Sequence, residues 1–463
     1  MGRESYKGME GIESDKSGRR GFLKKSGALG AGLILANPFN IISKPLNSAD
    51  EVKVALVGCG GRGGGVAFSN IPKIPGCNLV AVCDIVESRR ENFKARHKKS
   101  TGKNINAYED FYQMLDKEKL DAVVLTTPDF WHMQHTVDAL EAGIHVYCEK
   151  AMSNKLEDAY KMAAAMKKTG KLLQIGRQRR SNDRYRFMYH NLLKKEQMFG
   201  RLTHAIGQWN RSQIWSQMPN KKDQLDFKTL KKYGFETEDQ VYNWRNYKKL
   251  GGGVVSDLGS HQIDIFNWFF DAYPKTVYAT GNNSYFGFEQ ADTMATILEY
   301  DTPKGPAIGI YENISNSRAI GVYERFVGDN GAFIISEGKD NKIYRESRVK
   351  ADEWKHLIDK GYIDQYSKVA KYKAKESGDS GIRETAPQIA YDIKDIKDLD
   401  IIYNLPAHTA HLKNFIEAVR GVEKLNYDAE MAFKSEVCIY KIHDAINAGG
   451  DKIAITEDDY KVI

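Results

Sequence analysis

The sequence predicts an α/β protein built in two parts, and two patterns along the chain carry that prediction. Between about residues 49 and 175, continuous apolar runs alternate strictly with helical stretches, which is typical of a parallel sheet covered on both faces. From residue 176 onward, the runs alternate apolar with polar residues, which is typical of an antiparallel sheet with one buried face. We therefore expect a parallel-sheet domain followed by an α+β domain with a large open, mostly antiparallel sheet.

The first part contains apolar runs that we expect to be buried strands, each but the last followed by a helix. The predicted strands are VKVALV, CNLVAVCD, LDAVVLTTP, HVYCEK and KLLQIG. The predicted helices are Gly63–Ile71, Glu87–Lys99, FWHMQHTVDALEAG and Leu156–Thr169.

The second part contains long alternating runs flanked by helices. The runs are RLTHAIGQWNRS, KTVYATGNNSYF, TMATILEYD, PAIGIYENIS and YERFVGDNGAFIISE. The predicted helices are Asp183–Lys195, Ser256–Phe270, Thr409–Arg420 and Met431–Ala448. The lysine-rich stretch Arg345–Lys375 has no clear period, so we expect an insertion or a surface excursion there.

The first strand ends in VGCGGRG, which places Gly58, Gly60 and Gly63 at G-x-G-x-x-G spacing between a strand and a helix. In a dinucleotide-binding fold the first glycine permits a tight turn, the second lets the backbone approach a pyrophosphate, and the third lets the helix pack on the strand. The helix N-terminus adds unpaired N–H donors for the phosphates. Because Asp84 closes the next strand, the pattern predicts a Rossmann dinucleotide-binding domain over residues 49–175.

Asp84 also indicates which dinucleotide binds. A carboxylate at this place accepts hydrogen bonds from the ribose hydroxyls of NAD and repels the 2′-phosphate of NADP. Arg89 and Arg90 lie close by and could bind such a phosphate, but Glu87 and Glu91 on the same helix favour a solvated face. We therefore expect NAD rather than NADP.

The segment 1–48 has the pattern of an export signal and linker. The pair RR at 19–20 precedes FLK, and the apolar stretch at 28–36 is too short to span a bilayer. This order resembles a twin-arginine signal, which exports folded proteins, and the alternative is a disordered basic tail. We expect an exported, periplasmic protein whose mature form has no membrane segment.

The composition argues against several other classes of protein. With 41% hydrophobic and 28% charged residues, the chain is typical of a soluble globular protein. The net charge is +7, but the first fifty residues supply +3 of it and no basic stripe follows, so we expect no nucleic-acid partner. The five cysteines show no paired spacing, and His132 and His135 have no further ligand nearby in sequence. We therefore expect neither disulfides nor a metal site.

Two short stretches carry candidate catalytic groups. Lys150 follows the fourth strand, where the carboxyl ends of parallel strands form a ligand crevice, although a lysine that pairs with Glu149 would look the same. Asp257 and His261 lie four residues apart and so share one helix face. A helix cap at Asp257 and a buried core histidine at His261 are the alternatives. The residues alone leave these possibilities open.

Five motifs, taken in their order and spacing, resemble the Gfo/Idh/MocA family of sugar and inositol oxidoreductases. They are G-x-G-x-x-G at 58–63, Asp84, T-P-x-x-x-H at Thr127–His132, Glu149-Lys150, and G-G-G-x-x-x-D-x-G-x-H at Gly251–His261. The resemblance runs from about residue 51 to the end of the chain. It implies a Rossmann domain followed by a domain, residues 176–463, whose open sheet binds the substrate beside the nicotinamide and pairs with another subunit.

The resemblance assigns roles to residues of this chain. His261 would take the proton of a substrate hydroxyl, Lys150 would donate to its oxygen, and Asp257 would orient a sugar hydroxyl or the histidine, while a lysine base stays open. Cofactor contacts would come from Gly58, Gly60, Gly61, Arg62, Gly63, Asp84, Thr127, Pro128, His132, Glu149 and Lys150. Substrate contacts would come from Lys150, Arg177, Trp244, Asp257 and His261. One position departs from the family pattern: Ala151 follows Lys150 where proline is usual, which leaves the position of the lysine side chain open.

We therefore predict an NAD(P)-dependent dehydrogenase that acts on a CH–OH carbon of a sugar, polyol or glycoside. One alternative is the NAD-dependent glycosidase branch, which oxidises its sugar transiently and lacks the lysine that is present here as Lys150. A further alternative is a non-catalytic sensor of sugar or dinucleotide, against which Lys150, Asp257 and His261 together argue. By resemblance, we expect a homo-oligomer formed through the C-terminal sheet.

Overall fold

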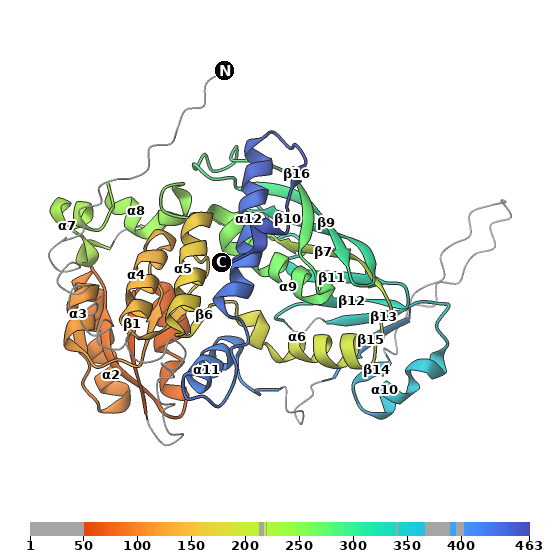
Figure 1. Cartoon of the computed structure of the whole chain (residues 1–463), viewed down its shortest axis with the longest axis horizontal. Helices are drawn as coiled ribbons and strands as arrows, with labels where there is room; N and C mark the ends of the chain where they lie inside the picture. Colours follow the sequence, from red (N-terminus) through yellow and green to blue (C-terminus); the bar gives the residue numbers. More distant parts are fainter. Residues whose placement is uncertain (1–50, 213–216, 219, 339–340, 366–388, 395–401) are drawn as a thin grey trace.

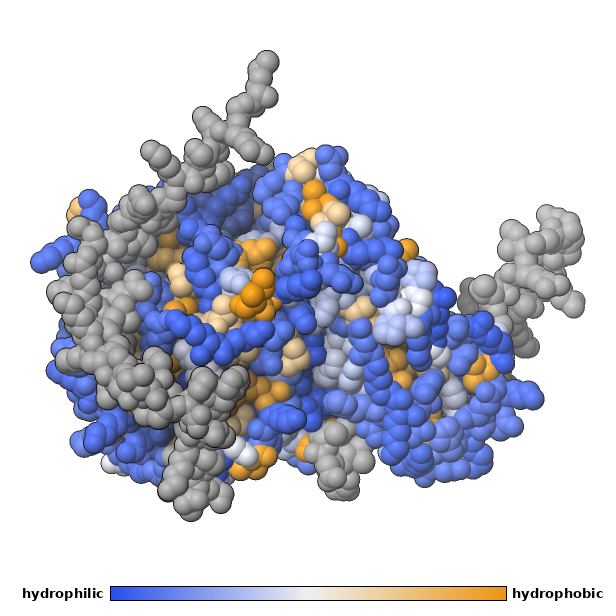
Figure 2. All heavy atoms as spheres, viewed as in Figure 1, coloured by the Kyte–Doolittle hydropathy of each residue, from blue (hydrophilic) through white to orange (hydrophobic). Residues whose placement is uncertain are grey.

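The computed structural model describes residues 51–212, 217–218, 220–338, 341–365, 389–394 and 402–463. The predicted export segment, residues 1–48, lies outside these ranges. In Figure 1 the first domain (red to yellow) lies beside the second domain (green to blue), and α12 (Ala429–Asn447) runs along the boundary between them. Figure 2 shows the same face as mostly hydrophilic, with hydrophobic residues in small separate patches. None of the helices within these ranges has the length and apolar character that a membrane span requires.

The first domain is built on a six-stranded parallel sheet in the order β3-β2-β1-β4-β5-β6, which is the strand order of dinucleotide-binding folds. Its strands are β1 (Val52–Val57), β2 (Cys77–Cys83), β3 (Asn106–Tyr108), β4 (Ala122–Leu125), β5 (His145–Cys148) and β6 (Leu173–Ile175). Its helices are α2 (Glu87–Thr101), α3 (Phe111–Lys117), α4 (Asp129–Glu141) and α5 (Leu156–Thr169). The predicted parallel sheet is thereby confirmed.

Two details of the first domain differ from the prediction. The helix expected at Gly63–Ile71 is a short π-helical segment, Gly63–Phe68, followed by a 3-10 turn at Ile71–Lys73. The sequence did not indicate β3 or α3, because β3 has three residues, none of them fully buried, and α3 has only seven. Segments this short carry too little hydrophobic period to be recognised.

The second domain is built on a ten-stranded sheet in the order β14-β15-β13-β12-β11-β7-β10-β9-β8-β16. Neighbouring strands are antiparallel except β7 and β10, which are parallel, so the mostly antiparallel sheet is confirmed. Its strands are β7 (Leu202–Trp209), β8 (Pro274–Asn282), β9 (Thr293–Thr302), β10 (Gly305–Ile314), β11 (Val322–Gly328), β12 (Gly331–Ile335), β13 (Lys342–Arg345), β14 (Ile363–Gln365), β15 (Ile389–Ile393) and β16 (Ile453–Ala454). Besides α12, the helices of this part are α6 (Asp183–Phe187), α7 (Phe227–Lys232), α8 (Glu238–Asn243), α9 (Ser260–Phe270), α10 (Lys355–Asp359) and α11 (Ala407–Val419).

The stretch Arg345–Lys375 was predicted as an insertion or a surface excursion, and its first part is packed against the sheet rather than being a surface excursion. It forms a 3-10 turn, α10 and the strand β14, which pairs with β15 at the edge of the sheet. Trp354 and Leu357 are buried in the core. Because these two apolar residues stand among many lysines, the stretch has almost no hydrophobic periodicity that the sequence could reveal. Residues 366–375 of the stretch lie outside the described ranges.

Helix α9 covers one face of the second sheet at close range. An added Cβ would lie 2.9 Å from the Phe266 ring at Gly207 of β7 and 3.0 Å from it at Gly309 of β10. The two glycines therefore let the helix approach the sheet. The Phe269 ring packs at a tilt against that of Phe326 of β11, with ring centroids 4.9 Å apart. This packing fixes the helix that carries His261.

Two C-terminal helices join the domains. Leu412 and Phe415 of α11 belong to the same buried cluster as Val54 and Leu56 of β1, so α11 covers a face of the first sheet. Helix α12 packs against α5 of the first domain and against α9 and β8 of the second. One hydrophobic core therefore runs through both domains, and the crevice between them is built on a single packed unit.

Candidate active site

A cavity of about 900 Å³ lies where the carboxyl ends of the parallel strands meet the second domain. Its walls come from the loop after β1, the ends of β2, β4 and β5, and residues of β7 and of the turn before α9. Ligands of open α/β sheets bind at this edge. The volume lies toward the upper end of the range for small-molecule sites, roughly 300–1,000 Å³.

The glycine loop forms one wall of the cavity, and its glycines serve two purposes. Gly58 has φ +95°, and a Cβ there would lie 2.7 Å from the Thr126 carbonyl oxygen. A Cβ at Gly63 would lie 2.0 Å from the Gly58 oxygen, so both positions require glycine for the turn itself. Gly60 and Gly61 line the cavity, and a Cβ would meet nothing within 4 Å at Gly61 and only Arg89, at 3.8 Å, at Gly60. Space beside these two glycines is therefore open to a phosphate group.

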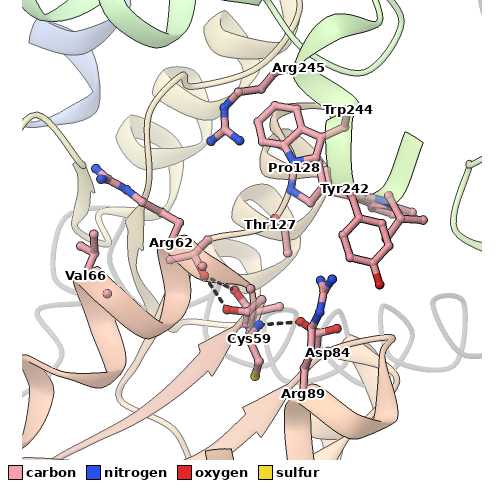
Figure 3. Close-up of a pocket in the computed structure, with 18 of the residues that line it drawn as sticks. Cys59, Arg62, Val66, Asp84, Arg89, Thr127, Pro128, Tyr242, Trp244 and Arg245 are labelled. Atoms are coloured by element: carbon pink, nitrogen blue, oxygen red, sulfur yellow. Dashed lines mark hydrogen bonds between the residues drawn. The ribbon is translucent and has the colours of Figure 1, made fainter. Parts of the chain in front are cut away.

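Asp84 lies at the end of β2 and lines the same cavity. Its carboxylate accepts a hydrogen bond from the main-chain N–H of Cys59, at 2.5 Å (Figure 3). It also accepts one from the main-chain N–H of Val86, at 2.8 Å. Burial raises the pKa of Asp84, while Arg89 and the two hydrogen bonds oppose that effect. The carboxylate is thus fixed between the glycine loop and the start of α2.

Thr127 and Pro128 follow β4 and also line the cavity. Thr127 Oγ1 is buried and has no hydrogen-bond partner within the part of the chain that the structure describes. Such a hydroxyl is available to a ligand or an ordered water as its hydrogen-bond partner. Together with the open space at the glycines and the carboxylate of Asp84, this orphaned hydroxyl fits a dinucleotide.

His132 and Glu149, both predicted as cofactor contacts, lie behind the cavity rather than on its lining. The two ring nitrogens of His132 lie 2.7 Å from the Ala151 oxygen and 2.8 Å from the Thr127 oxygen. Glu149 accepts from Arg62 at 3.0 Å and 2.8 Å. His132 therefore positions the main chain at Thr127 and Ala151, and Glu149 positions the side chain of Arg62, which lines the cavity.

Lys150 extends from the end of β5 into the cavity, so alanine at 151 does not turn it away. Its Nζ donates to the main-chain oxygen of Asp257 at 2.6 Å and to the Asp257 carboxylate. Arg245, which no motif in the sequence indicated, donates to the same carboxylate oxygen at 3.1 Å. The structure thus brings together Lys150 and Asp257, which stand far apart in the sequence.

The pKa values of the three central groups are shifted by burial and by one another. Burial lowers the pKa of Lys150, with Arg62 and Arg245 adding to that effect and Asp257 opposing it. Burial alone would raise the pKa of Asp257, but Lys150 and Arg245 hold it below its ordinary value. Burial, and then the nearby Lys150, lower the pKa of His261 well below its ordinary value. The arrangement therefore contains a neutral imidazole beside an ammonium–carboxylate pair.

His261 is the second residue of α9. It lines the cavity, and 3% of its surface is exposed. Its ring lies 5.5 Å from the Trp209 ring, centroid to centroid. Nδ1 is buried and has no hydrogen-bond partner among the described residues. Asp257 precedes it in the π-helical turn Val255–Gly259, which continues into α9. The two residues were expected to share one helix face. Both line the cavity, although they lie on two joined helical segments.

Of the two remaining substrate contacts that were expected, one lines the cavity and one does not. Trp244 is in the lining, and the Arg245 guanidinium lies 4.0 Å from its ring centroid. Arg177 is a correction: it is buried outside the lining, where it pairs with Glu436 of α12 at 2.5 Å and donates to the Ser260 oxygen. It therefore holds the domains together and does not face a ligand.

Several polar residues of the cavity were missed in the sequence. Gln178, Glu337 and His408 line it, and Gln178 donates to Glu337 at 3.2 Å. Gln178 follows β6 at the same sheet edge as Lys150, and that position is the signal that could have marked it. Glu337 and His408 come from distant segments, so nothing local in the sequence places them here.

Comparisons with known proteins agree with this geometry. Residues 52–177 match the oxidoreductase family model of an NAD-binding Rossmann fold, and residues 225–455 match the same family's C-terminal α/β domain. A glycosyl hydrolase family 109 protein of Shewanella putrefaciens is 22% identical over 411 residues, which cover 78% of this chain and 84% of the relative. The scyllo-inositol 2-dehydrogenase (NAD(+)) of Bacillus subtilis is 25% identical over 290 residues, which cover 62% of this chain and 74% of the relative.

A solved structure shows the same fold. The WlbA dehydrogenase of Chromobacterium violaceum, in complex with NADH and UDP-GlcNAcA, has a TM-score of 0.63 at 20% identity and covers 90% of this chain and 100% of its own. The strand order, the glycine loop and both family matches point the same way. The N-terminal domain is an NAD-binding Rossmann domain, and the chain belongs to the Gfo/Idh/MocA family of oxidoreductases.

Proposed function

We propose that this protein is an NAD-dependent oxidoreductase that transfers a hydride between nicotinamide and a ring hydroxyl carbon of a sugar, polyol or glycoside. The observation that carries the proposal is the contact between Lys150 and Asp257, beside His261, in the cavity that also contains the glycine loop. Oxidation of an alcohol needs a proton acceptor and a charge-stabilising donor next to a dinucleotide site. This cavity offers all three.

The residues that would hold NAD are the glycine loop, Asp84 and Thr127, and the bound cofactor would supply the hydride acceptor. Lys150 has three N–H donors, of which Asp257 takes two, so one is left for the substrate oxygen. That donor stabilises the negative charge that develops on the oxygen. His261 accepts the hydroxyl proton, and because the ammonium stabilises the alkoxide, an imidazole of low pKa is a sufficient base.

Asp257 receives a different role from the one expected. It was expected to orient a sugar hydroxyl or the histidine, whereas its carboxylate contacts Lys150 and Arg245. We assign to it the fixing of the Lys150 ammonium. The substrate side of the cavity is lined by the Trp244 ring and by the amide and carboxylate of Gln178 and Glu337. Aromatic faces with a few polar groups suit a carbohydrate, which has both apolar faces and hydroxyls.

The direct test is a substrate screen with purified protein. We expect NADH to form when NAD is mixed with one class among inositols, aldoses and glycosides, and we expect the variants Lys150→Ala and His261→Ala to lose that activity. Unchanged turnover in both variants would exclude this mechanism. If a sugar of the panel binds but no member of the panel is turned over, the non-catalytic sensor is favoured instead.

A second candidate function is supported by one relative. The glycosyl hydrolase family 109 protein covers more of this chain than the inositol dehydrogenase does, 78% against 62%. We therefore keep an NAD-dependent glycosidase, which oxidises its sugar transiently, as the alternative. The two functions are separated by measuring sugar release from a glycoside together with NADH formation. Release of the sugar without net formation of NADH supports the glycosidase. Formation of NADH without release of the sugar supports the dehydrogenase.

We also infer that two copies of the chain pair through the open face of the second sheet. Tyr278, Ile297, Ile310 and Ile206 stand opposite one another across β8, β9, β10 and β7. Ile297 and the neighbouring Ile308 are 44% and 38% exposed. An exposed apolar row of this kind suits the core of an interface. Sedimentation of wild type and of Ile297→Lys tests the inference, because the variant should be monomeric.

Export through the twin-arginine route remains our proposal for residues 1–48. The pair at 19–20 followed by FLK supports it. Arg19→Lys combined with Arg20→Lys should leave the protein inside the cytoplasm, as fractionation would show, while equal export of this variant would contradict the proposal.

A further inference from the structure

Arg89 and Arg90 follow Asp84 at the start of α2, where a basic side chain could bind the 2′-phosphate of NADP. The two arginines lie differently. Arg90 Nη1 donates to the main-chain oxygens of Asp84, at 3.2 Å, and Ile85, at 3.3 Å, so it is turned toward the backbone. Arg89 lines the cavity, and Figure 3 shows its guanidinium between Asp84 and Tyr242. Only Arg89 is therefore placed to meet a group on the ribose.

A carboxylate from the second domain binds Arg89. Asp223, the last residue of the 3-10 turn Lys221–Asp223, accepts from Arg89 Nε at 3.4 Å. Its other oxygen accepts from the Ser88 hydroxyl. The side chains of Arg89 and Asp223 are 21% and 18% exposed, so water screens the pair only in part. Because this contact joins residues 134 positions apart, no local sequence pattern reveals it.

Tyr242 completes the arrangement. The Arg89 guanidinium lies 4.8 Å from the centroid of the Tyr242 ring, and the Tyr242 hydroxyl donates to the main-chain oxygen of Asp223 at 3.4 Å. Asp223 and Tyr242 both belong to the segment 221–246, which also supplies Trp244 to the cavity. The segment thus holds the guanidinium by a carboxylate on one side and an aromatic face on another.

The charges at this end of the cavity are unequal. Asp84, Glu109 and Asp223 contribute carboxylates to the lining, and Arg89 is the arginine among them. Glu109 is paired with Lys232 at 3.3 Å, and the Arg90 guanidinium near Asp84 lies outside the lining, bound to main-chain oxygens. Arg89 is therefore the guanidinium that Asp84 and Asp223 share within the lining. Ribose hydroxyls can donate to carboxylates, whereas a phosphate dianion is repelled by them.

We propose that Asp223 is a positioning residue that selects NAD over NADP, because it holds Arg89 in an ion pair and places a second carboxylate beside Asp84. The sequence alone assigned this selection to Asp84. The structure adds a partner from the other domain that neutralises the one arginine able to bind the 2′-phosphate. The proposal rests on NAD binding by the first domain and is independent of the sugar chemistry.

The test compares the two dinucleotides on the full-length protein. Kd values for NAD and NADP are measured by displacement of NADH, followed by its fluorescence, in wild type and in Asp223→Asn. The variant keeps the shape of the side chain and removes its charge, so NADP should bind about tenfold more tightly, while the Kd of NAD changes by less than about threefold. A residue with a purely structural role would weaken both dinucleotides together, so the ratio of the two Kd values is the diagnostic quantity.

Two further variants make the result specific. Glu236→Gln removes a charge from an exposed position of the same segment and should leave the ratio unchanged. In Arg89→Ala combined with Asp223→Asn, most of the gain in NADP affinity should disappear, since the guanidinium that binds the phosphate is gone. A ratio within about twofold of wild type in Asp223→Asn would overturn the proposal. So would a double variant that keeps the whole gain. A protein that oxidises no sugar would still give a clear answer in this assay.

Discussion

The ammonium of Lys150 is bound by two oxygens of one residue, the main-chain oxygen and a carboxylate oxygen of Asp257. Lys150 follows the strand β5 of the first domain, and Asp257 lies in a helical turn of the second. The contact therefore exists only when both domains are docked. It leaves one N–H of the ammonium for a ligand in the cavity.

Removing that ammonium should reduce turnover sharply while leaving cofactor binding almost unchanged. Lys150→Met keeps the length of the side chain and removes the donor to the substrate oxygen, so we expect kcat/KM to fall by about 100- to 1,000-fold. The Kd of NAD should change by less than about threefold, because the glycine loop and Asp84 are untouched. Asp257 keeps Arg245 as a partner, so the fold should persist. Steady-state kinetics together with NAD titration check this, and retention of a tenth of the activity would contradict the assigned role.

The pH profile of kcat/KM should be shaped by Lys150 on the alkaline side. Burial lowers the pKa of this lysine below its ordinary value of 10.5, so the charged, donating form is present at lower pH and is lost as the pH rises through the lowered pKa. His261, whose pKa is well below 6.5, stays neutral through the neutral range. We therefore expect an alkaline fall below pH 10.5 and no fall near pH 6.5. An acid limb centred near 6.5 would show that His261 titrates normally.

Asp257 should determine the pH at which kcat/KM falls on the alkaline side, the alkaline limb of the profile. Its carboxylate raises the pKa of Lys150 against the effect of burial. In Asp257→Asn the ammonium loses this stabilisation, so the limb should move to lower pH, by about one unit or more. Arg245→Gln is the matched control, because removing a neighbouring positive charge should move the limb the other way. A limb that does not move in either variant would assign it to another group.

The sequence predicted the parts of the site that follow from strand order. The glycine loop, Asp84 and Lys150 all stand at strand ends, and strand ends in a parallel sheet meet at one edge. That Lys150 and Asp257 share one site was reached only through resemblance, and their direct contact was not predicted, since no local pattern joins residues of two domains. Arg245 and Glu337 were missed for the same physical reason: each enters the cavity through tertiary packing.

Arg177 shows why a residue type at a promising position can mislead. It follows β6 at the ligand edge of the sheet, as Gln178 does, yet its side chain turns into the boundary between the domains. The direction is decided by Glu436, which α12 brings to the same place and which is itself fully buried. A buried carboxylate requires a cation, and the sequence does not show where α12 will pack.

The stability of the domain boundary should depend on this buried ion pair. In Arg177→Met the carboxylate of Glu436 loses its cation, and the free energy of unfolding should fall by about 3–5 kcal/mol. Adding Glu436→Gln to that variant removes the unpaired charge and should recover more than half of the loss. Urea denaturation of the two variants and wild type measures both steps. Normal stability with lost substrate binding in Arg177→Met would restore Arg177 as a substrate ligand.

The glycine loop permits a matched pair of substitutions that separates folding from cofactor binding. At Gly58 the backbone has φ +95° and a Cβ would lie 2.7 Å from a main-chain oxygen, so Gly58→Ala should reduce the free energy of unfolding, by about 1–3 kcal/mol from the backbone conformation alone. At Gly60 a Cβ meets only the Arg89 side chain, at 3.8 Å, so Gly60→Ala should fold with wild-type stability. Its methyl group, however, occupies space that lines the cavity, and it should weaken NAD binding by about tenfold or more. Thermal unfolding and NAD titration of the two variants check the contrast. If Gly60→Ala binds NAD as wild type does, the pyrophosphate does not approach the backbone at this glycine.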